Sequence, residues 1–136
     1  QHLPPAHPPV VPYFLKQALR NGSLIVHSDG SQTRDYVYVD DVVSGLIAAS
    51  TAPNLDGLVI NIGSGKETAV SDLVQKVLDV TGSKPEVIYN AKTSPGVSRM
   101  CADLTLAKQK LNYKPSIPLT DGLRLTLQRD PRLKVA

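Results

Sequence analysis

The sequence predicts an α/β domain, because short apolar runs that suit strands alternate along the chain with amphipathic patterns that suit helices. The 136 residues are 41% hydrophobic and 20% charged, which allows one globular domain with a modest core. We expect this domain to span residues 10–130, between a proline-rich irregular arm at 1–9 and a tail at 131–136. The one methionine is Met100 and the start lacks the features of a signal peptide, so we expect a piece of a larger protein.

Four short runs have the composition and the flanking turn residues of β-strands. The run at 58–62 is apolar apart from Asn61, which is typical of a strand buried on both faces. The run at 35–39 is rich in tyrosine and valine, and a Ser-Asp-Gly-Ser turn at 28–31 precedes it. In chain order, strands are predicted at 24–26, 35–39, 58–62 and 86–89.

Five amphipathic patterns predict helices. The clearest begins near Val70, with Thr68 as its N-cap and Gly82 as its end. In the first helix, Pro12 is tolerable in the first turn and Gly22 is placed to end the helix. In chain order, helices are predicted over 10–19, from Asp40 or Asp41 to Ala49, from Thr68 to Gly82, from Asp103 to Leu111, and from Thr120 to Leu127.

The composition argues against nucleic acid, membranes and metal clusters. The net charge of +3 suits an anionic ligand, but the basic residues are scattered and the aromatic residues show no stacking pattern. No apolar run approaches the roughly 20 residues that span a bilayer. The single cysteine, Cys101, excludes an internal disulfide and a cysteine-based metal cluster. We interpret it as a small, part-buried side chain in a cytoplasmic protein.

The segment from Asp29 to Asp41 places an arginine at the mouth of a strand. A glycine-containing turn leads to Arg34, and the strand runs directly into an acidic helix start. A guanidinium held there can offer a planar fork to a pair of phosphate oxygens, which makes Arg34 a candidate anion ligand. The alternative is a surface arginine that is simply solvated.

A second candidate lies at 61–65, where the predicted buried strand ends in Gly-Ser-Gly. Ligands of open α/β sheets bind beyond such strand ends, and Asn61 could offer its amide to a ligand hydroxyl there. The segment has neither the longer glycine-rich fingerprint nor the acidic residue that ends a second strand, so a complete dinucleotide site is rejected. The alternative role of the glycines is a tight turn into the next helix.

The third candidate is Arg99, which follows a loop predicted at 93–96 that contains Pro95 and Gly96. The backbone of such a loop can approach a ligand closely, and the arginine could then reach an anion. The alternative, equally open at this point, is an ion pair between Arg99 and Asp103, four residues further along.

Together these segments resemble the extended short-chain dehydrogenase/reductases, which are NAD-dependent epimerases, 4,6-dehydratases and decarboxylases of nucleotide-sugars. The resemblance rests on four motifs in order: DGSQTRDYVYVDD, NIGSG, PGVSR followed by Ala-Asp, and Leu-x-Tyr-x-Pro. The first motif is highly specific to the group. The match runs from about Val10 to Leu127 and covers only the C-terminal, substrate-binding part of the family, so most of the Rossmann domain is expected to be missing.

The resemblance implies ligand contacts for four residues. Arg34 corresponds to the arginine that contacts the ribose and diphosphate of the nucleotide-sugar, and Arg99 to a second arginine that closes on the diphosphate from the opposite side. Val26 falls where the family packs apolar atoms against the nucleobase. Asn61 falls where a strand-end asparagine lies near the nucleotide.

The chain departs from the family pattern in what it lacks. The sequence contains no glycine-rich NAD motif and no Tyr-x-x-x-Lys pair, in which the tyrosine is the acid/base and the lysine lowers its pKa. We therefore expect no catalytic residue and no NAD site in this chain, and an isolated chain that is inactive. Ser28 stands where many members have glycine, and Asp40 and Asp41 match acidic residues of mainly structural role.

Three hypotheses remain: a partial copy of a nucleotide-sugar epimerase, dehydratase or decarboxylase, a free-standing nucleotide-sugar-binding module, or a repurposed protein-interaction domain. Retention of both Arg34 and Arg99 argues against the third. In the family, the segments 42–49 and 58–62 pack partly against the missing NAD-binding domain. We therefore expect an exposed apolar face and marginal stability, relieved by self-association. The sugar is not specified, and uridine is slightly preferred to deoxythymidine.

Overall fold

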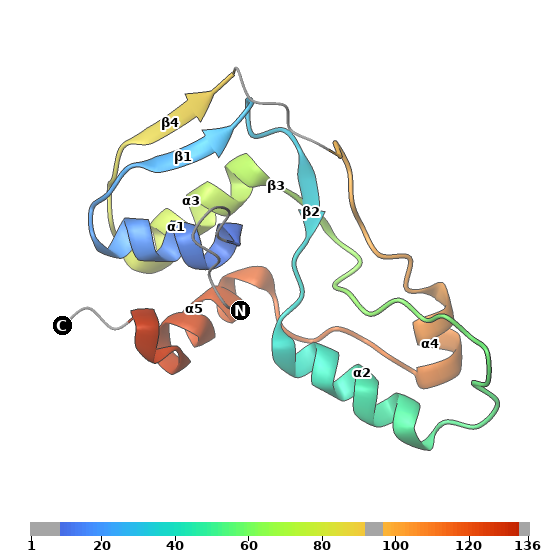
Figure 1. Ribbon diagram of the computed structural model, residues 1–136. Helices are drawn as coiled ribbons and strands as arrows, with labels where there is room; N and C mark the ends of the chain where they lie inside the picture. Colours follow the sequence, from blue (N-terminus) through green and yellow to red (C-terminus); the bar gives the residue numbers. More distant parts are fainter. Residues whose placement is uncertain (1–8, 92–96, 134–136) are drawn as a thin grey trace.

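The computed structural model describes residues 9–91 and 97–133 and forms an elongated α/β molecule (Figure 1), which confirms the predicted class. The predicted loop at 93–96, most of the arm at 1–9 and the last three residues of the tail lie outside the described residues. The elements are α1 (Val10–Leu19), β1 (Leu24–His27), β2 (Thr33–Asp35), α2 (Val39–Thr51), β3 (Glu67–Ala69), α3 (Val70–Thr81), β4 (Val87–Asn90), α4 (Thr105–Leu111), α5 (Leu119–Arg129) and the 3-10 turn η1 (Pro131–Leu133).

Two small sheets connect these elements. Strand β1 pairs in parallel with β4, so the strands predicted at 24–26 and 86–89 are confirmed with a one-residue shift at their ends. Strand β2 pairs antiparallel with β3, in a register that places Arg34 opposite Thr68. In Figure 1 this second sheet lies between the helices α1, α3 and α5 on one side and α2 and α4 on the other.

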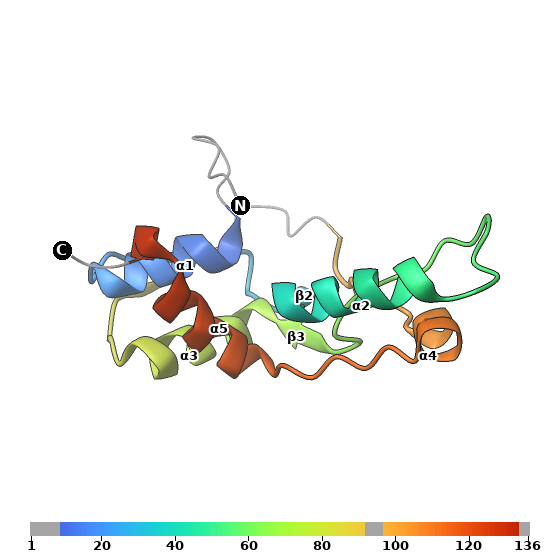
Figure 2. The same cartoon turned by 90° about the horizontal axis from the view of Figure 1, so that it is seen from below.

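The larger of two hydrophobic cores lies under the β1–β4 sheet. Helix α3 contacts α1, α5 and β1, and η1 adds Leu133 to the same cluster. Figure 2 shows α1, α3 and α5 side by side. The apolar stripe predicted for the third helix is what α3 buries, because its buried positions repeat at helical spacing. The buried members of this core are Phe14, Leu15, Ala18, Leu24, Val26, Val70, Leu73, Val74, Val77, Leu123 and Leu133.

A smaller core lies between α2 and α4. Leu104, Ala107 and Leu111 are buried there, and alanines of α2 pack against them. The ring of Tyr113 closes this core, and its hydroxyl donates a hydrogen bond of 2.9 Å to the carbonyl oxygen of Gly63. Burial raises the pKa of Tyr113, and the nearby carboxylates of Asp41 and Asp35 raise it further.

The helix ends follow the sequence more closely than the helix starts do. Helix α1 ends in a Schellman motif: the amide of Gly22 donates to the carbonyl of Gln17 at 2.9 Å, while Asn21, not the glycine, takes the left-handed conformation. Helix α3 ends at Gly82, whose φ of 65° lies in the left-handed region that favours glycine, as predicted.

The predicted N-caps were wrong at three helices. Helix α3 begins only at Val70, because Thr68 is used in the β2–β3 pairing, and α5 begins at Leu119, one residue before Thr120. Helix α2 begins at Val39, so Asp40 and Asp41 lie inside its first turn, where a negative charge favours the helix dipole. Asp103 lies just before α4 and accepts the amide of Thr105 at 2.9 Å, so it acts nearly as predicted.

Two predicted strands differ from the structure. The strand expected at 35–39 is β2 at 33–35, since β3 is only three residues long and the chain then turns into α2. The buried strand predicted at 58–62 is not a strand. A strand buried on both faces needs neighbours, and no described residue pairs with this segment. Ile60 and Ile62 pack on the smaller core, while Val59 is 85% exposed.

An apolar surface results, which we call the α2 face. It combines four exposed side chains of α2 with two from the segment that follows, and it matches the predicted exposed apolar face. Leu46 and Ile47 stand out, with 62% and 63% of their surface exposed. The members of the α2 face are Val39, Val43, Leu46, Ile47, Leu58 and Val59. Among the described residues, no helix is long and apolar enough to cross a membrane.

Asp41 joins α2 to the segment that leads into α5. Asp41 is 3% exposed. Its carboxylate accepts the amide and hydroxyl of Ser116, both at 2.9 Å, and the amide of Ile117 at 3.0 Å. Burial alone would raise the pKa of Asp41, but these hydrogen bonds outweigh it and lower the pKa below its usual value. Asp40, in contrast, lies at the surface and pairs with Arg129 at 2.9 Å.

Replacing Asp41 by asparagine should lower the free energy of unfolding by about 1 to 3 kcal/mol, because the new NH₂ group faces a backbone donor. Since the folded pKa is lowered, the stabilisation by Asp41 is present above about pH 4 and is lost as the pH falls through the folded pKa. Urea unfolding of wild type and Asp41→Asn should therefore differ at pH 7 and converge as the pH falls through the folded pKa of Asp41. Asp121→Asn, at an exposed ion pair, is the control and should change stability by less than about 0.5 kcal/mol. An Asp41→Asn variant as stable as wild type at pH 7 would contradict this role.

Candidate functional site

Three chain segments meet at strand β2. Strand β3 pairs along one of its edges, and the amide of Thr33 donates to the carbonyl of Ser98 at 2.9 Å on the other side. The turn at 63–65 packs against Asp35 at the end of the strand. The arginine-bearing segments 34 and 97–99 are therefore brought together although they lie more than sixty residues apart in sequence.

Asp35 holds this junction together. One carboxylate oxygen accepts the amide and hydroxyl of Ser64, at 2.8 and 2.5 Å. The other accepts the amides of Gly65 at 2.9 Å and Ala102 at 3.1 Å. Partial burial would raise the pKa of Asp35, but these hydrogen bonds outweigh it, so the pKa is lowered and the side chain stays a carboxylate at neutral pH.

The turn at 63–65 needs glycine for reasons of space. A Cβ on Gly63 would lie 2.6 Å from the Cβ of Ala102 and 2.7 Å from the Oδ2 of Asp35. Gly65 has φ of +67°, a conformation that residues with side chains rarely adopt. The alternative interpretation of this Gly-x-Gly, a tight turn, therefore describes what the glycines do in the structure.

Arg34 lies on β2 and directs its guanidinium along the strand edge. Its Nη1 donates to the carbonyl of Thr33 at 2.7 Å and to the carbonyl of Val97 at 2.8 Å. Side chains alternate between the two faces of a strand, so Arg34 and Thr68 share one face of the β2–β3 sheet. The side chain is half-buried and bound to backbone carbonyls, which holds the guanidinium at the edge beside 97–99.

Arg99 pairs with Glu67, not with Asp103. Its Nε donates to Oε2 of Glu67 at 3.0 Å, and its Nη2 contacts Oε1, which makes a two-point ion pair. The open alternative of a pair with Asp103 is thereby wrong, since that carboxylate bonds to Thr105. The pair raises the pKa of Arg99 and lowers the pKa of Glu67, in both cases chiefly through the hydrogen bonds between them.

The side chains of Asn61 and Val26 make no hydrogen bond with Arg34 or Arg99 within the part of the chain that the structure describes. Asn61 is exposed in the irregular segment that replaces the predicted strand, and its side-chain amide lies 3.5 Å from the carbonyl oxygen of Asp103. Val26 faces the larger core and is 1% exposed, whereas its neighbours Ile25 and His27 on β1 face solvent. The segments that carry Arg34 and Arg99 meet at one edge of β2. Arg34 shares a sheet face with Thr68, whereas Glu67, the partner of Arg99, belongs to the other face.

Sequence reasoning missed Asp35 and Glu67. The role of Asp35 could have been predicted from the sequence. Asp35 directly follows Arg34, and an aspartate at a strand end can accept the backbone amides of a nearby glycine turn. The role of Glu67 could not be predicted in this way, because its partner Arg99 lies 32 residues away and the strand register brings the two together. Cys101, predicted to be part-buried, is exposed. The pKa of its thiol is raised by desolvation and by the nearby Asp35 and Glu67, which disfavours a nucleophilic role.

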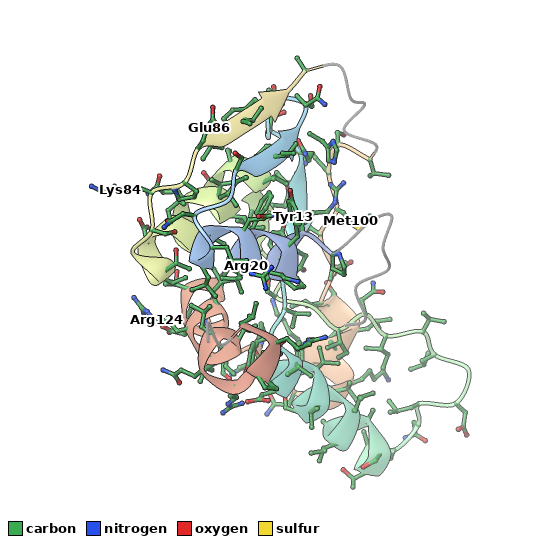
Figure 3. The ribbon with its side chains drawn as sticks, turned by 60° about the vertical axis from the view of Figure 1, so that its left-hand side comes forward. Tyr13, Arg20, Lys84, Glu86, Met100 and Arg124 are labelled. Atoms are coloured by element: carbon green, nitrogen blue, oxygen red, sulfur yellow. The ribbon has the colours of Figure 1, made fainter. Side chains whose placement is uncertain are left out.

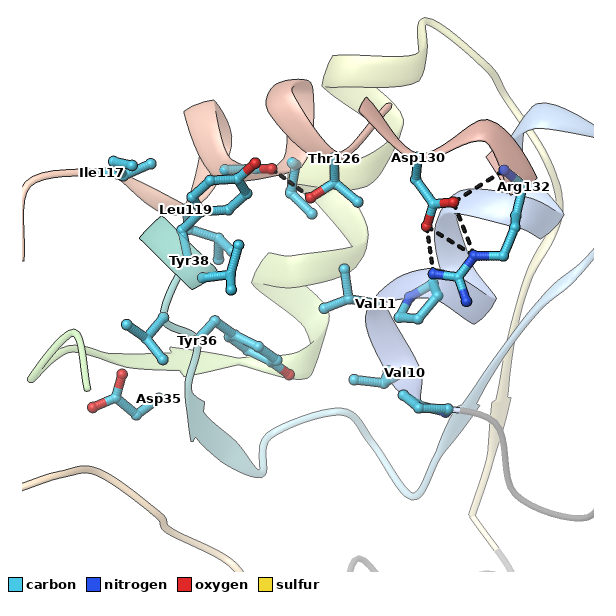
Figure 4. Close-up of a pocket in the computed structure, with 16 residues that line it drawn as sticks. Val10, Val11, Asp35, Tyr36, Tyr38, Ile117, Leu119, Thr126, Asp130 and Arg132 are labelled. Carbon is cyan, nitrogen blue, oxygen red and sulfur yellow. Dashed lines mark hydrogen bonds and ion pairs between the residues drawn. The ribbon is translucent and has the colours of Figure 1, made fainter. Parts of the chain in front are cut away.

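A cavity of about 500 Å³ is lined by Tyr36 and lies between the start of α1, the β2–α2 connection and α5 (Figure 4). Its walls are largely apolar, with the Asp130–Arg132 ion pair at one end. The hydroxyl of Tyr36 is buried there and has no hydrogen-bond partner within the described ranges 9–91 and 97–133. Burial raises the pKa of Tyr36. No cluster of histidine, cysteine or carboxylate side chains suited to a metal ion is found among residues 9–91 and 97–133.

Comparison with known proteins identifies the group to which this arrangement belongs. Residues 4–63 match the model of the NAD dependent epimerase/dehydratase family. A UDP-glucose 4-epimerase from Thermotoga maritima, solved with UDP-glucose, is 35% identical and superposes with a TM-score of 0.83 over 93% of this chain. The chain belongs to that family. It covers 40% of the Thermotoga maritima chain, so it corresponds to a part of an extended short-chain dehydrogenase/reductase.

Two curated relatives also match this chain over only a part of their own length. An uncharacterised UDP-glucose epimerase of Bacillus subtilis is 36% identical over 81% of this chain, which spans 35% of that relative. A UDP-N-acetyl-alpha-D-glucosaminuronate decarboxylase of Bacillus cytotoxicus is 31% identical over 88% of this chain and 39% of its own length. The chain thus spans well under half the length of the relatives it matches.

Replacing Asp35 by asparagine should loosen the junction, because one oxygen and one NH₂ group cannot satisfy the donors that two carboxylate oxygens accept. We expect a loss of about 2 to 3 kcal/mol in unfolding free energy. Hydrogen exchange should accelerate at the amides of Ser64, Gly65 and Ala102. Asp56→Asn, in an exposed loop, is the matched control and should leave these rates unchanged. Unaltered exchange in Asp35→Asn would show that the carboxylate does not hold the three segments.

Proposed function

We propose that the chain is the nucleotide-sugar-binding portion of an NAD-dependent epimerase, dehydratase or decarboxylase. The observation that carries the proposal is the placement of Arg34 and Arg99 beside each other's segments at one edge of β2. Two guanidinium groups on a framework held by Asp35 supply the positive charge and the paired donors that a diphosphate needs without a metal ion.

The nucleotide is proposed to be a uridine or deoxythymidine diphosphate, with uridine favoured because the relatives are described as acting on or binding UDP-sugars. Arg34 and Arg99 would contact the diphosphate. Asn61 would lie near the nucleotide, and Val26 would support the base from the core through the strand that carries it. The choice between epimerase, dehydratase and decarboxylase depends on residues outside these segments.

Catalysis is proposed to require a part that this sequence does not contain. The chain has no Tyr-x-x-x-Lys pair and no glycine-rich NAD motif, so it supplies neither the acid/base nor the cofactor site that the family reaction uses. The NAD-binding domain is proposed to cover the α2 face, since several large apolar side chains exposed on one helix are typical of an interface. A free-standing nucleotide-sugar-binding module is the second candidate, and the retained arginine pair favours it over a repurposed interaction domain.

Calorimetric titration tests the binding. Wild type should bind UDP-glucose and UDP but not uridine, which lacks the diphosphate. Arg34→Gln and Arg99→Gln should each weaken UDP binding by about tenfold or more, because each removes charge-assisted hydrogen bonds of roughly 1.5 to 3 kcal/mol. Arg124→Gln, on α5 and away from Met100 and its neighbours (Figure 3), is the control and should bind as wild type does. The same samples with NAD should form no product. No UDP binding by folded wild type, or equal binding by all variants, would contradict the proposal.

The α2 face should drive self-association of the isolated chain. Sedimentation velocity of wild type should show a concentration-dependent increase in mass, because burial of these side chains removes apolar surface from water. Ile47→Lys should abolish this increase. Ile88→Lys, which places the same charge at an exposed apolar position of β4, is the control and should self-associate like wild type. A wild-type chain that stays monomeric at all concentrations would contradict this part of the proposal.

A further inference from the structure

The donor edge of Arg99 is already occupied in this structure. Nε lies 3.0 Å from Oε2 of Glu67, and Nη2 contacts Oε1. This two-point arrangement is the one by which a guanidinium recognises carboxylates and phosphates alike. Glu67 therefore sits, relative to Arg99, where a pair of phosphate oxygens would sit in a bound diphosphate.

The carboxylate of Glu67 is itself held in place by the sheet. It stands on β3 opposite Asp35, and Oγ1 of Thr33 donates to its Oε2 at 2.9 Å. The hydrogen bonds from Arg99 and Thr33 lower the pKa of Glu67, so it remains charged at neutral pH. Arg99 is thus drawn across β2 and kept pointing over the face that carries Thr33.

The ion pair is nevertheless exposed enough to exchange. The side chain of Arg99 is 76% exposed and that of Glu67 is 31% exposed. Ion pairs at such positions add little net stability, because water and salt screen them. A diphosphate carries more negative charge than one carboxylate, so it can compete with Glu67 for the Arg99 guanidinium.

We propose that Glu67 is a positioning residue: it holds the Arg99 guanidinium ready for the diphosphate of a nucleotide-sugar and is displaced from it when that ligand binds. This inference rests on the proposed function. Glu67 has two opposed effects, since it orders Arg99 before binding but competes with the ligand during binding. The negative charge of Glu67 makes it compete with the diphosphate for Arg99. The hydrogen bonds that Glu67 accepts hold the Arg99 guanidinium in place before the ligand binds.

Two substitutions separate these effects. Glu67→Gln keeps an amide oxygen that can accept from Arg99 but removes the charge, so UDP should bind about two- to fivefold more tightly, which corresponds to the roughly 1 kcal/mol or less of an exposed ion pair. Glu67→Ala removes both the charge and the ordering contact, so UDP should bind more weakly than to Glu67→Gln. Glu86→Gln, next to β4 (Figure 3), changes the other glutamate of the chain and should leave the affinity unchanged.

The measurement is calorimetric titration with UDP, repeated in an Arg99→Gln background. There the effect of Glu67→Gln should vanish, because Glu67 acts through Arg99. In wild type labelled with ¹³C, the side-chain carboxylate signal of Glu67 should also shift on addition of UDP, as the ion pair opens. If wild type binds UDP but Glu67→Gln binds equally or more weakly, the positioning role is overturned while the proposed function stands. If no variant binds UDP, the proposed function fails, and this inference fails with it.

Discussion

The carboxylate of Asp35 is the interaction on which the candidate site depends. It accepts three backbone amides and one hydroxyl from two segments distant in sequence, and so fixes the turn at 63–65 and residues 101–102 against the end of β2. A carboxylate can satisfy so many donors only while it is ionised, and the same hydrogen bonds keep its pKa low. The positions of Arg34 and Arg99 follow, because both lie on segments next to this junction.

Each arginine is held by the protein through contacts that resemble those of a ligand. Arg34 donates to two backbone carbonyls, and Arg99 pairs with Glu67. Fixed side chains lose less entropy on binding than free ones, so such contacts favour recognition as long as they can be exchanged. The contacts to Arg34 are neutral and the contact to Arg99 is ionic, which makes the second arginine the one whose affinity depends on the charge of its neighbour.

The sequence alone predicted the α/β class, helix α1, the β1–β4 strands and the end of α3 at Gly82, because these features depend on local periodicity and turn residues. The prediction from sequence failed where the local structure depends on contacts with segments that are distant in sequence. The run at 58–62 has the composition of a buried strand, but strand formation needs a partner that the described residues do not offer. Thr68 has the side chain of an N-cap, yet its backbone is used by the pairing with Arg34. The Arg99–Glu67 pair follows from strand register, which the sequence does not specify.

Amide-resolved NMR spectroscopy of the isolated chain with UDP tests the central claim most directly, because it reports folding and binding in one experiment. Dispersed signals are predicted, with shifts on UDP addition at Arg34, Arg99 and the Asp35 junction, and none at Ile88 on the outer strand. Dispersed signals that do not respond to UDP, or shifts spread evenly over the chain, would contradict a diphosphate site between the two arginines.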